Sequence, residues 1–216
     1  INPDDVVKKY GADSFRMYEM FMGPLEKSKP WSTKGLQGCY RFLQKVWRLF
    51  NNENIEIQKN CADEDTKRLL HQSIKKASND LDGLRFNTVV SKLMIFTNHL
   101  STLDVLDKDV LHQFLILLNP FAPHLTEELN EKLGYQPITS MMWPKYDEKL
   151  ILDEVVTMAV QFKGKTRGTI NVAPGTNEKD AMQVVEDTAF GKKYLSLGKV
   201  IKVVYIPNKI INIITK

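Results

Sequence analysis

The hydrophobic periodicity of this chain changes once, after about Pro144, and that change limits the folds available to it. Before that point apolar residues recur every three or four positions, as in Leu36, Tyr40, Leu43, Trp47 and Phe50. Such spacing predicts amphipathic helices. After it the apolar residues alternate with polar or small ones, as in Val156, Met158, Val160 and Phe162. Alternation predicts half-buried strands, so we expect a mainly α chain that ends in a small α+β domain.

The helical part divides into a short entry segment and a bundle. Residues 1–33 predict two short helices and a loop. Four amphipathic helices follow, at about 34–50, 70–81, 86–100 and 110–133. The fourth is interrupted at Asn119-Pro120, because proline cannot continue the helical hydrogen-bond ladder. Helices joined by short connections bury their apolar faces against one another, so residues 34–135 predict an antiparallel four-helix bundle.

The C-terminal part predicts a β-hairpin, one helix and a pair of strands. Lys163-Gly164-Lys165 supplies the hairpin turn, and the second strand runs to about Val172. The helix is expected at 177–190, and the last two strands at 200–206 and 209–214. We therefore expect a linker at 136–153 and a compact domain at 154–216.

Charge is distributed unevenly along the chain. Residues 151–216 hold 10 Lys and Arg against 6 Asp and Glu, which leaves 20 of each kind in residues 1–150. The whole net charge of +4 thus lies in the last third, as expected for a surface that faces a polyanion. The longest strongly apolar run, Phe114–Leu118, is too short to cross a bilayer, and the N-terminus has no signal-peptide pattern. No membrane partner is expected.

The residues predict no catalytic or metal site. Ala159–Thr166 nearly matches a phosphate-binding loop, but that motif needs glycine at position 159 and a loop that leads into a helix. The four histidines form no close ligand pair. Cys39 and Cys61 predict free thiols that are buried or half-buried. Glu127 and Glu128 adjoin, but neighbouring helix positions point in different directions.

Basic faces remain as candidate binding sites. Lys163, Lys165 and Arg167 flank the hairpin turn, and the spacing of Lys163 and Arg167 predicts one side of a strand. The full set of candidate RNA-binding residues is Lys163, Lys165, Arg167, Lys192, Lys193, Lys199, Lys202, Arg41, Lys45 and Arg48. A second basic row on the bundle is Lys67, Arg68, His71 and Lys75. The first bundle row is Arg41, Lys45 and Arg48. For each of the two bundle rows, a solvated surface is favoured over an RNA contact. For the C-terminal set, RNA contact and solvated lysines both stay open on the residues alone.

Several segments, in order along the whole chain, resemble leucyl-tRNA synthetases of bacterial or organellar type. Phe15–Thr33 is similar to the stretch after the catalytic domain, and Val160–Ile170 to the opening hairpin of the C-terminal domain. Further similar segments are Tyr10–Arg16, Phe86–Met94, Asn119–Leu129, Trp143–Asp147 and Val204–Asn212. The chain departs from the family at Asn130, where tryptophan is common, and at Lys163, where asparagine is frequent.

The resemblance implies that this chain is the tRNA-handling C-terminal portion of such an enzyme. It would bind leucine tRNA and position it for leucylation by catalytic and editing domains of the same polypeptide, which use ATP and Mg²⁺. The signature loops for that chemistry would lie upstream of Ile1, so no catalytic residue and no cofactor are expected here. The absence of an initiator Met predicts that residue 1 is an internal position of a longer protein.

The family also implies a monomer in the bacterial cytoplasm or an organellar matrix. Two alternatives remain. One is a helical module that binds a protein partner, with the lysines only keeping the surface hydrated. The other is the same region of a synthetase specific for valine, isoleucine or methionine.

Overall fold

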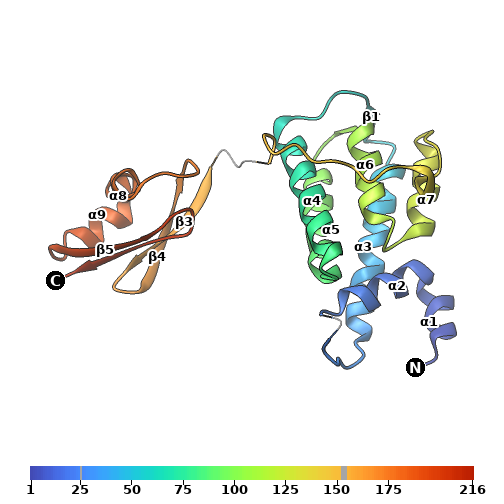
Figure 1. Cartoon of the computed structure of the whole chain (residues 1–216), viewed down its shortest axis with the longest axis horizontal. Coiled ribbons are helices and arrows are strands. Elements are labelled where there is room, and N and C mark those ends of the chain that lie inside the picture. Colours follow the sequence, from blue (N-terminus) through green and yellow to red (C-terminus); the bar gives the residue numbers. More distant parts are fainter. Residues whose placement is uncertain (25, 152–154) are drawn as a thin grey trace. The chain divides into compact units, whose positions relative to one another are not determined.

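The computed structural model describes residues 1–24, 26–151 and 155–216. They form two compact units, whose boundary falls between Ile151 and Leu152. Each unit has a hydrophobic core of its own. The first is helical and the second is a four-stranded sheet with two helices (Figure 1). The expected fold class, mainly α with a small α+β part, is confirmed. Two parts of the chain lie outside the described residues. One is Leu25 in the predicted entry segment. The other is residues 152–154, where the predicted linker meets the C-terminal domain.

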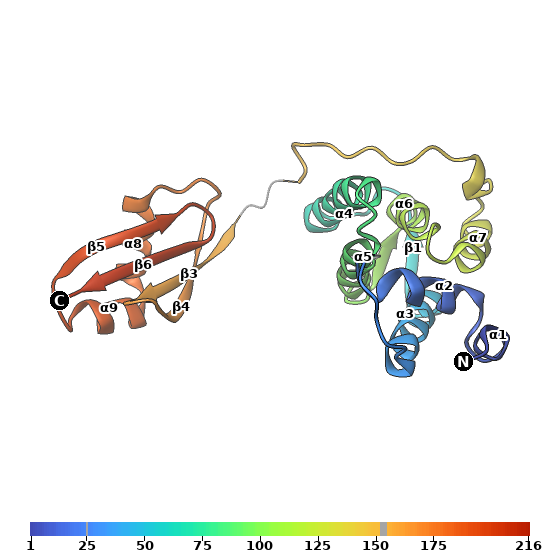
Figure 2. The ribbon, with the colours of Figure 1, turned by 60° about the horizontal axis from the view of Figure 1, so that its bottom comes forward.

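The first unit follows the predicted order of helices. They are α1 (Pro3–Tyr10), α2 (Ala12–Phe21), α3 (Thr33–Asn51), α4 (Glu64–Asp82), α5 (Phe86–Leu100), α6 (Lys108–Leu118) and α7 (Pro123–Lys132). Figure 2 looks nearly along several of them and shows α4, α5, α6 and α3 gathered around one core, with α7 beside α6. The predicted fourth helix is two separate helices, α6 and α7, which the turn around Asn119-Pro120 brings into contact with each other.

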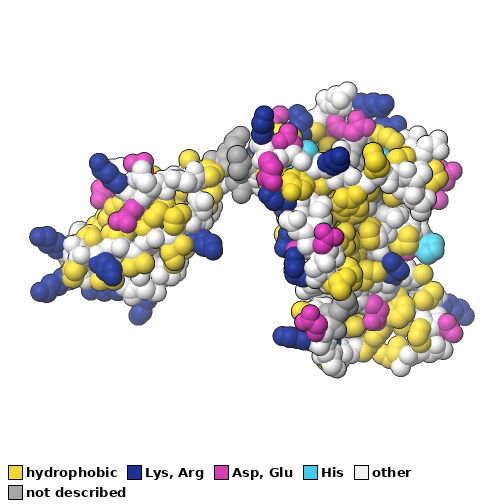
Figure 3. Space-filling model, in the orientation of Figure 1, with side chains coloured by type: hydrophobic (Ala, Val, Ile, Leu, Met, Phe, Trp, Pro, Cys, Tyr) yellow, Lys and Arg dark blue, Asp and Glu magenta, His cyan; other side chains and the backbone are white. Residues whose placement is uncertain are grey.

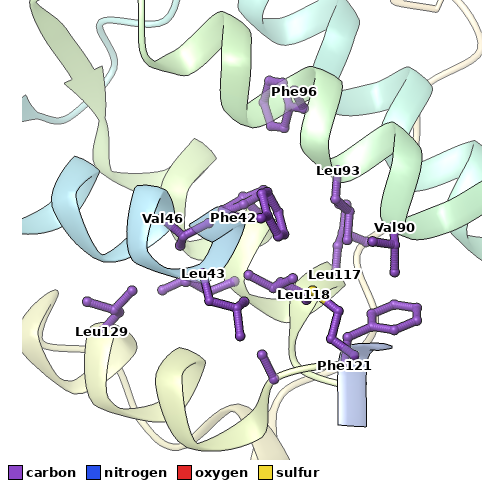
Figure 4. Close-up of a cluster of buried hydrophobic side chains, with 14 of the residues drawn as sticks. Phe42, Leu43, Val46, Val90, Leu93, Phe96, Leu117, Leu118, Phe121 and Leu129 are labelled. Atoms are coloured by element: carbon purple, nitrogen blue, oxygen red, sulfur yellow. The ribbon is translucent and has the colours of Figure 1, made fainter. Parts of the chain in front are cut away.

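Apolar faces of α3, α5, α6 and α7 meet in the centre of this unit (Figure 4). The labelled side chains are Phe42, Leu43, Val46, Val90, Leu93, Phe96, Leu117, Leu118, Phe121 and Leu129. All of them are buried. Burying a side chain of this size contributes about 1.5–3 kcal/mol, so packing rather than helix propensity holds the bundle together.

A buried carboxylate closes the turn between α4 and α5. Asp80 accepts from Arg85 Nε at 3.0 Å and from Thr88 Oγ1, and its Oδ2 lies 2.6 Å from Lys76 Nζ. Burial alone would raise the pKa of Asp80, but the hydrogen bonds from these three residues lower it by more. The charge is thereby compensated inside the fold, and the two helices are held as a hairpin.

Two of the segments that carried the resemblance contact each other. Asp13 in α2 accepts from the backbone N–H of Leu125 at 2.7 Å and pairs with His124 Nδ1 at 2.8 Å. Arg16 Nε donates to the carbonyl of Pro120 at 2.8 Å. Asp13 therefore supplies the cap that α7 lacks in its own sequence, since Ala122 at its N-cap has no side-chain acceptor. Asp13 and Arg16 together hold α2 against the turn between α6 and α7.

A two-stranded parallel pair, absent from the sequence prediction, joins the two long loops of the bundle. It consists of β1 (Glu56–Gln58) and β2 (Val105–Asp107). At its end one buried carboxylate, Asp107, accepts four backbone N–H groups. Oδ1 receives those of Asp109 and Val110 at the start of α6, and Oδ2 receives those of Cys61 and Ala62. Three-residue strands carry too little alternation to be read from sequence.

The predicted linker is packed over most of its length. Residues 136–151 belong to the first unit. Ile138 is buried, Trp143 Nε1 donates to Ser78 Oγ at 2.9 Å, and the backbone N–H of Asp147 donates to His71 Nδ1 at 3.0 Å. An irregular segment can lie on a bundle when its polar groups find partners in this way.

The second unit has strand order β4-β3-β6-β5. Its strands are β3 (Val156–Phe162), β4 (Lys165–Val172), β5 (Val200–Ile206) and β6 (Ile210–Thr215). The single helix predicted at 177–190 is instead two, α8 (Glu178–Asp187) and α9 (Ala189–Leu195). Thr188 is extended between them, and its Oγ1 accepts from Gly191 N at 2.9 Å, which starts a second helix. Both helices lie behind the sheet in Figure 2.

The two cysteines differ in exposure. Cys39 is buried in α3, and burial raises the pKa of its thiol to about 11. Cys61 is exposed, so the expectation that both thiols are buried or half-buried is wrong for this residue. It lies in the loop that Asp107 holds, outside the bundle core.

Candidate nucleic-acid interface

One end of the small sheet brings together several of the predicted basic residues. β3 and β6 run parallel and finish there, and the antiparallel β4 and β5 begin there. The turn between β3 and β4 therefore lies at the same end as the chain terminus, where Lys216 N donates to the carbonyl of Lys199. We call this the hairpin end. It carries Lys163, Lys165, Lys199 and Lys216.

The turn itself forces an unfavourable backbone on Lys163. Lys163 and Gly164 both have positive φ, at 50° and 78°, the arrangement of a two-residue type I′ hairpin turn. Gly164 N also donates to Asn212 Oδ1 at 3.1 Å, which ties the turn to β6. A lysine rarely adopts the left-handed region, whereas asparagine and glycine do so readily. A turn of this type therefore suits asparagine better than lysine at position 163.

An irregularity in β4 places the Arg167 side chain beside Tyr194 of α9. Val160 pairs with Gly168 and Gln161 with Thr166, so Arg167 is an extra residue, a β-bulge. Its guanidinium carbon lies 5.0 Å from the centre of the Tyr194 ring, within cation–π distance. The predicted relation of Lys163 and Arg167 by even strand spacing is therefore wrong, because one residue is in the turn and the other is bulged.

A hollow of about 270 Å³ lies beside this contact. Its lining residues come from the hairpin, from α9 and the turn after it, and from the last strand: Phe162, Lys163, Lys165, Arg167, Tyr194, Leu197 and Thr215. The Phe162 and Tyr194 rings are 5.0 Å apart. The site thus combines aromatic walls with three cations, although only the cations were predicted from sequence. The available signal for Tyr194 was its place directly after two lysines.

Acidic residues are segregated away from this site. Within residues 155–216, every Asp and Glu lies in α8: Glu178, Asp180, Glu186 and Asp187. Among the described residues no carboxylate comes within 4 Å of Lys163, Lys165 or Arg167 to form an ion pair. Figure 3 shows basic side chains gathered on this unit over the end that carries the C terminus. Cations that lack acidic neighbours in the described structure form a positive surface field.

The other C-terminal candidates lie in different places. Lys193 Nζ is 5.9 Å from the centre of the Tyr194 ring, and Lys192 is exposed beside it on α9. Lys199 is at the hairpin end. Lys202 lies on the sheet face opposite the helices, because Val203 packs against the core. Lys202 is therefore separated from the hollow.

The candidate residues on the helical bundle have less structural support as RNA contacts than those at the hairpin end. Arg41 and Arg48 are exposed on α3, and Lys45 donates to Asn98 Oδ1 at 2.7 Å on α5. Neither helix contains an acidic residue, so this face is positive. In the other row, Lys67 pairs with Glu64 and Lys75 pairs with Glu148. That row serves local structure.

Replacing Lys163 by asparagine should separate stability from binding. An asparagine side chain suits the left-handed backbone of this turn, so in Lys163→Asn the free energy of unfolding of the second unit should rise by about 0.5–1 kcal/mol. The same change removes one cation, so RNA affinity should fall and the salt slope should decrease by roughly one unit. Chemical denaturation and a salt titration of binding measure the two effects. A stable variant that binds RNA with the parent's slope would remove Lys163 from the interface.

Three other kinds of feature are absent from the described residues: a phosphate-binding loop, a cluster of metal ligands and a membrane-spanning helix. Ala159–Thr166 forms the hairpin and not a loop that enters a helix, so its likeness to a phosphate-binding loop is superficial. Among residues 1–24, 26–151 and 155–216, no three His, Cys, Asp or Glu side chains are grouped closely enough to hold a metal ion. In the same ranges no helix has the length and apolar character required to cross a bilayer.

Comparison with known proteins gives the family. The sequence model described as "Anticodon-binding domain of tRNA ligase" matches residues 63–183, more than half of the chain. The chain belongs to this family. Its match begins at Asp63, the N-cap of α4, and ends within α8.

Whole-chain similarity is to leucine–tRNA ligases. That of Chlorobaculum parvum is 41% identical over all of this chain, and that of Borrelia hermsii is 42% identical, again over all of it. A crystal structure of a LeuRS from Agrobacterium radiobacter, in a ternary complex with tRNA and LeuAMS, has a TM-score of 0.78 and 28% identity over the whole chain. The resemblance noted from the sequence motifs is confirmed. The chain spans 27% and 26% of the two curated relatives and 30% of the crystallised one.

Proposed function

We propose that this chain is the tRNA-binding C-terminal part of a leucine–tRNA ligase and that its hairpin end holds the RNA backbone. The observation that carries the proposal is the set of cations Lys163, Lys165 and Arg167 at one end of the sheet, with no ionic partner among the described residues. Similarity to a LeuRS solved with tRNA supports the choice of RNA over another polyanion. The whole-chain matches to leucine–tRNA ligases support leucine over valine, isoleucine or methionine.

Its contribution to leucylation would be positioning. Phosphate contacts fix the register and orientation of a nucleic acid without reading its sequence. An RNA held at a remote point presents its acceptor end to catalytic residues elsewhere in the polypeptide, and orientation lowers the activation barrier. ATP, Mg²⁺ and the editing function would belong to those other domains. A monomer in the bacterial cytoplasm, or in an organellar matrix, stays a prediction.

Within this proposal Lys163, Lys165 and Arg167 bind first, supported by Lys192, Lys193 and Lys199. Lys202 would contact RNA only if the RNA extended over the open sheet face. Arg41, Lys45 and Arg48 form a secondary surface on the first unit.

A salt titration tests the proposal. The variant Lys163→Ala, Lys165→Ala, Arg167→Ala should lower affinity for leucine tRNA and reduce the slope of log K against log salt by about 2–3 units, since each lost phosphate contact removes roughly one. The matched control is Lys179→Ala, an exposed lysine on the acidic helix α8, which should change neither quantity. Equal slopes for the triple variant and the parent would rule out the hairpin end.

A second set of RNAs addresses specificity. Leucine tRNA, another tRNA and a leucine tRNA with an altered elbow should be bound with decreasing affinity if this unit reads tRNA shape. Affinity for a protein partner that is independent of salt and of RNA would favour the interaction-module alternative.

A further inference from the structure

We propose that the hollow at the hairpin end binds a single nucleotide that is unstacked from the RNA, with its base against the apolar wall and its phosphate on the cations. This assignment rests on the proposed RNA-binding function and narrows it. The lysines by themselves explain contact with the backbone, but they do not explain why aromatic and aliphatic side chains line the same hollow.

The size of the hollow sets an upper limit on its ligand. Sites for drug-sized molecules occupy about 300–1,000 Å³. At about 270 Å³ the hollow lies just below that range, and it opens on the surface between the hairpin turn and the end of α9. It therefore has room for one base and not for a stacked dinucleotide.

Its walls suit the two chemical parts of a nucleotide. Phe162, Tyr194 and Leu197 form the apolar side, and the Leu197 side chain is 71% exposed although it borders an aromatic pair. Lys163, Lys165 and Arg167 form the charged side. Proteins bind unstacked bases by aromatic or guanidinium surfaces and combine these with backbone cations. Both kinds of group are adjacent here.

Arg167 is held in place before any ligand arrives. The bulge turns it toward α9, and its guanidinium lies over the Tyr194 ring. No described carboxylate competes for it. A cation held by an aromatic face loses less conformational entropy on binding than a free side chain, so the arrangement favours an anionic group at this point.

Nuclear magnetic resonance of the 216-residue chain tests the assignment, with uridine 5′-monophosphate as the probe. Amide shifts are expected at Gly164, Leu197 and Thr215. Leu197→Ala removes part of the apolar wall without removing charge, so it should weaken nucleotide binding by roughly fivefold. The control Ile201→Ala changes a comparably exposed residue, 62% exposed, that does not line the hollow. It should bind as the parent does.

Two further arms separate the assignment from simpler explanations. Inorganic phosphate that produced the same shifts with the same affinity would show a phosphate site only and would overturn the nucleotide assignment. The absence of shifts at all three amides would overturn it as well.

For leucine tRNA, Leu197→Ala should lower affinity and leave the salt slope unchanged, since no charge is lost. A tRNA affinity equal to that of the parent would count against the hollow. Loss of the salt slope in the triple cation variant, measured separately, would still support backbone binding, so the two proposals can fail independently.

Discussion

Replacing Gly191 by alanine should destabilise the second unit by about 3 kcal/mol, near the upper limit for overpacking a core. A Cβ built on Gly191 would lie 1.8 Å from the carbonyl oxygen of Val185 and 2.7 Å from Thr188 Oγ1. Neither group can easily move, because Thr188 Oγ1 bonds both Val185 O and Gly191 N at the junction of α8 and α9. The close approach of two backbones requires glycine here.

The size of the second unit makes this effect large relative to its total stability. A domain of about 60 residues is stabilised by roughly 3–9 kcal/mol. Losing about 3 kcal/mol should therefore unfold a measurable fraction of the unit at physiological temperature and displace Tyr194, with loss of RNA affinity. Since each unit has its own core, the first unit should unfold with the parent's free energy.

Thermal or chemical unfolding, followed by signals from individual residues, measures the free energy of unfolding of each unit. The control is Gly38→Ala on α3, where an added Cβ meets nothing within 4 Å. That change should stabilise the first unit by about 0.5–1 kcal/mol, because alanine is the better helix former. A Gly191→Ala variant that unfolds like the parent would show that the junction relaxes easily.

Removing the carboxylate of Asp107 should cost the first unit about 3 kcal/mol, since a helix cap is worth roughly 1 kcal/mol and each donor left without an acceptor costs about 1–3 kcal/mol. Asp107→Ala strips acceptors from the start of α6 and from Cys61 and Ala62 at once. Asp107→Asn should cost about half as much, because the amide oxygen can still cap α6 but the amide nitrogen cannot accept. Asp104→Ala, on an exposed side chain in the same loop, is the control and should be nearly neutral.

The same residue predicts a dependence on pH. Burial would raise the pKa of Asp107, but hydrogen bonds from Val110, Cys61, Ala62 and Asp109 lower it below the ordinary value of 3.8. A group with a lowered folded-state pKa contributes stability above its unfolded pKa, and this stability is lost as pH falls through the folded pKa. The parent should therefore lose stability below about pH 4 more steeply than Asp107→Asn. Parallel slopes for the two proteins would contradict the assignment.

Much of the fold could be predicted because the deciding signals are local. The spacing of Leu36 and Leu43 marks a helix face that is buried, although Trp47 of the same predicted stripe is 39% exposed. Alternation from Val156 to Phe162 marks the strand that became β3. Such patterns act within one or two turns of chain, where period and capping are sufficient. The uneven distribution of charge was also visible without a structure.

The errors fall where distant parts of the chain determine the outcome. The predicted helix at 177–190 is divided at Thr188, where the backbone of Gly191 lies against the carbonyl of Val185. Hydrophobic periodicity does not reveal that contact. Residues 136–151 read as a linker, yet Trp143 and Asp147 find partners on α4. β1 and β2 pair although they lie far apart in the sequence, and the carboxylate of Asp107 on β2 binds the backbone of Cys61 and Ala62 in the loop after β1.

For the candidate site, the sequence by itself determined which charges are present and that acidic residues are absent from the last strands and from α9. Only the tertiary structure decided how they are used. The parallel pairing of β3 with β6 places the turn beside the chain terminus, and the bulge directs Arg167 onto Tyr194. Strand register and bulges depend on side-chain packing across the sheet, a long-range property that residue spacing within one strand does not encode.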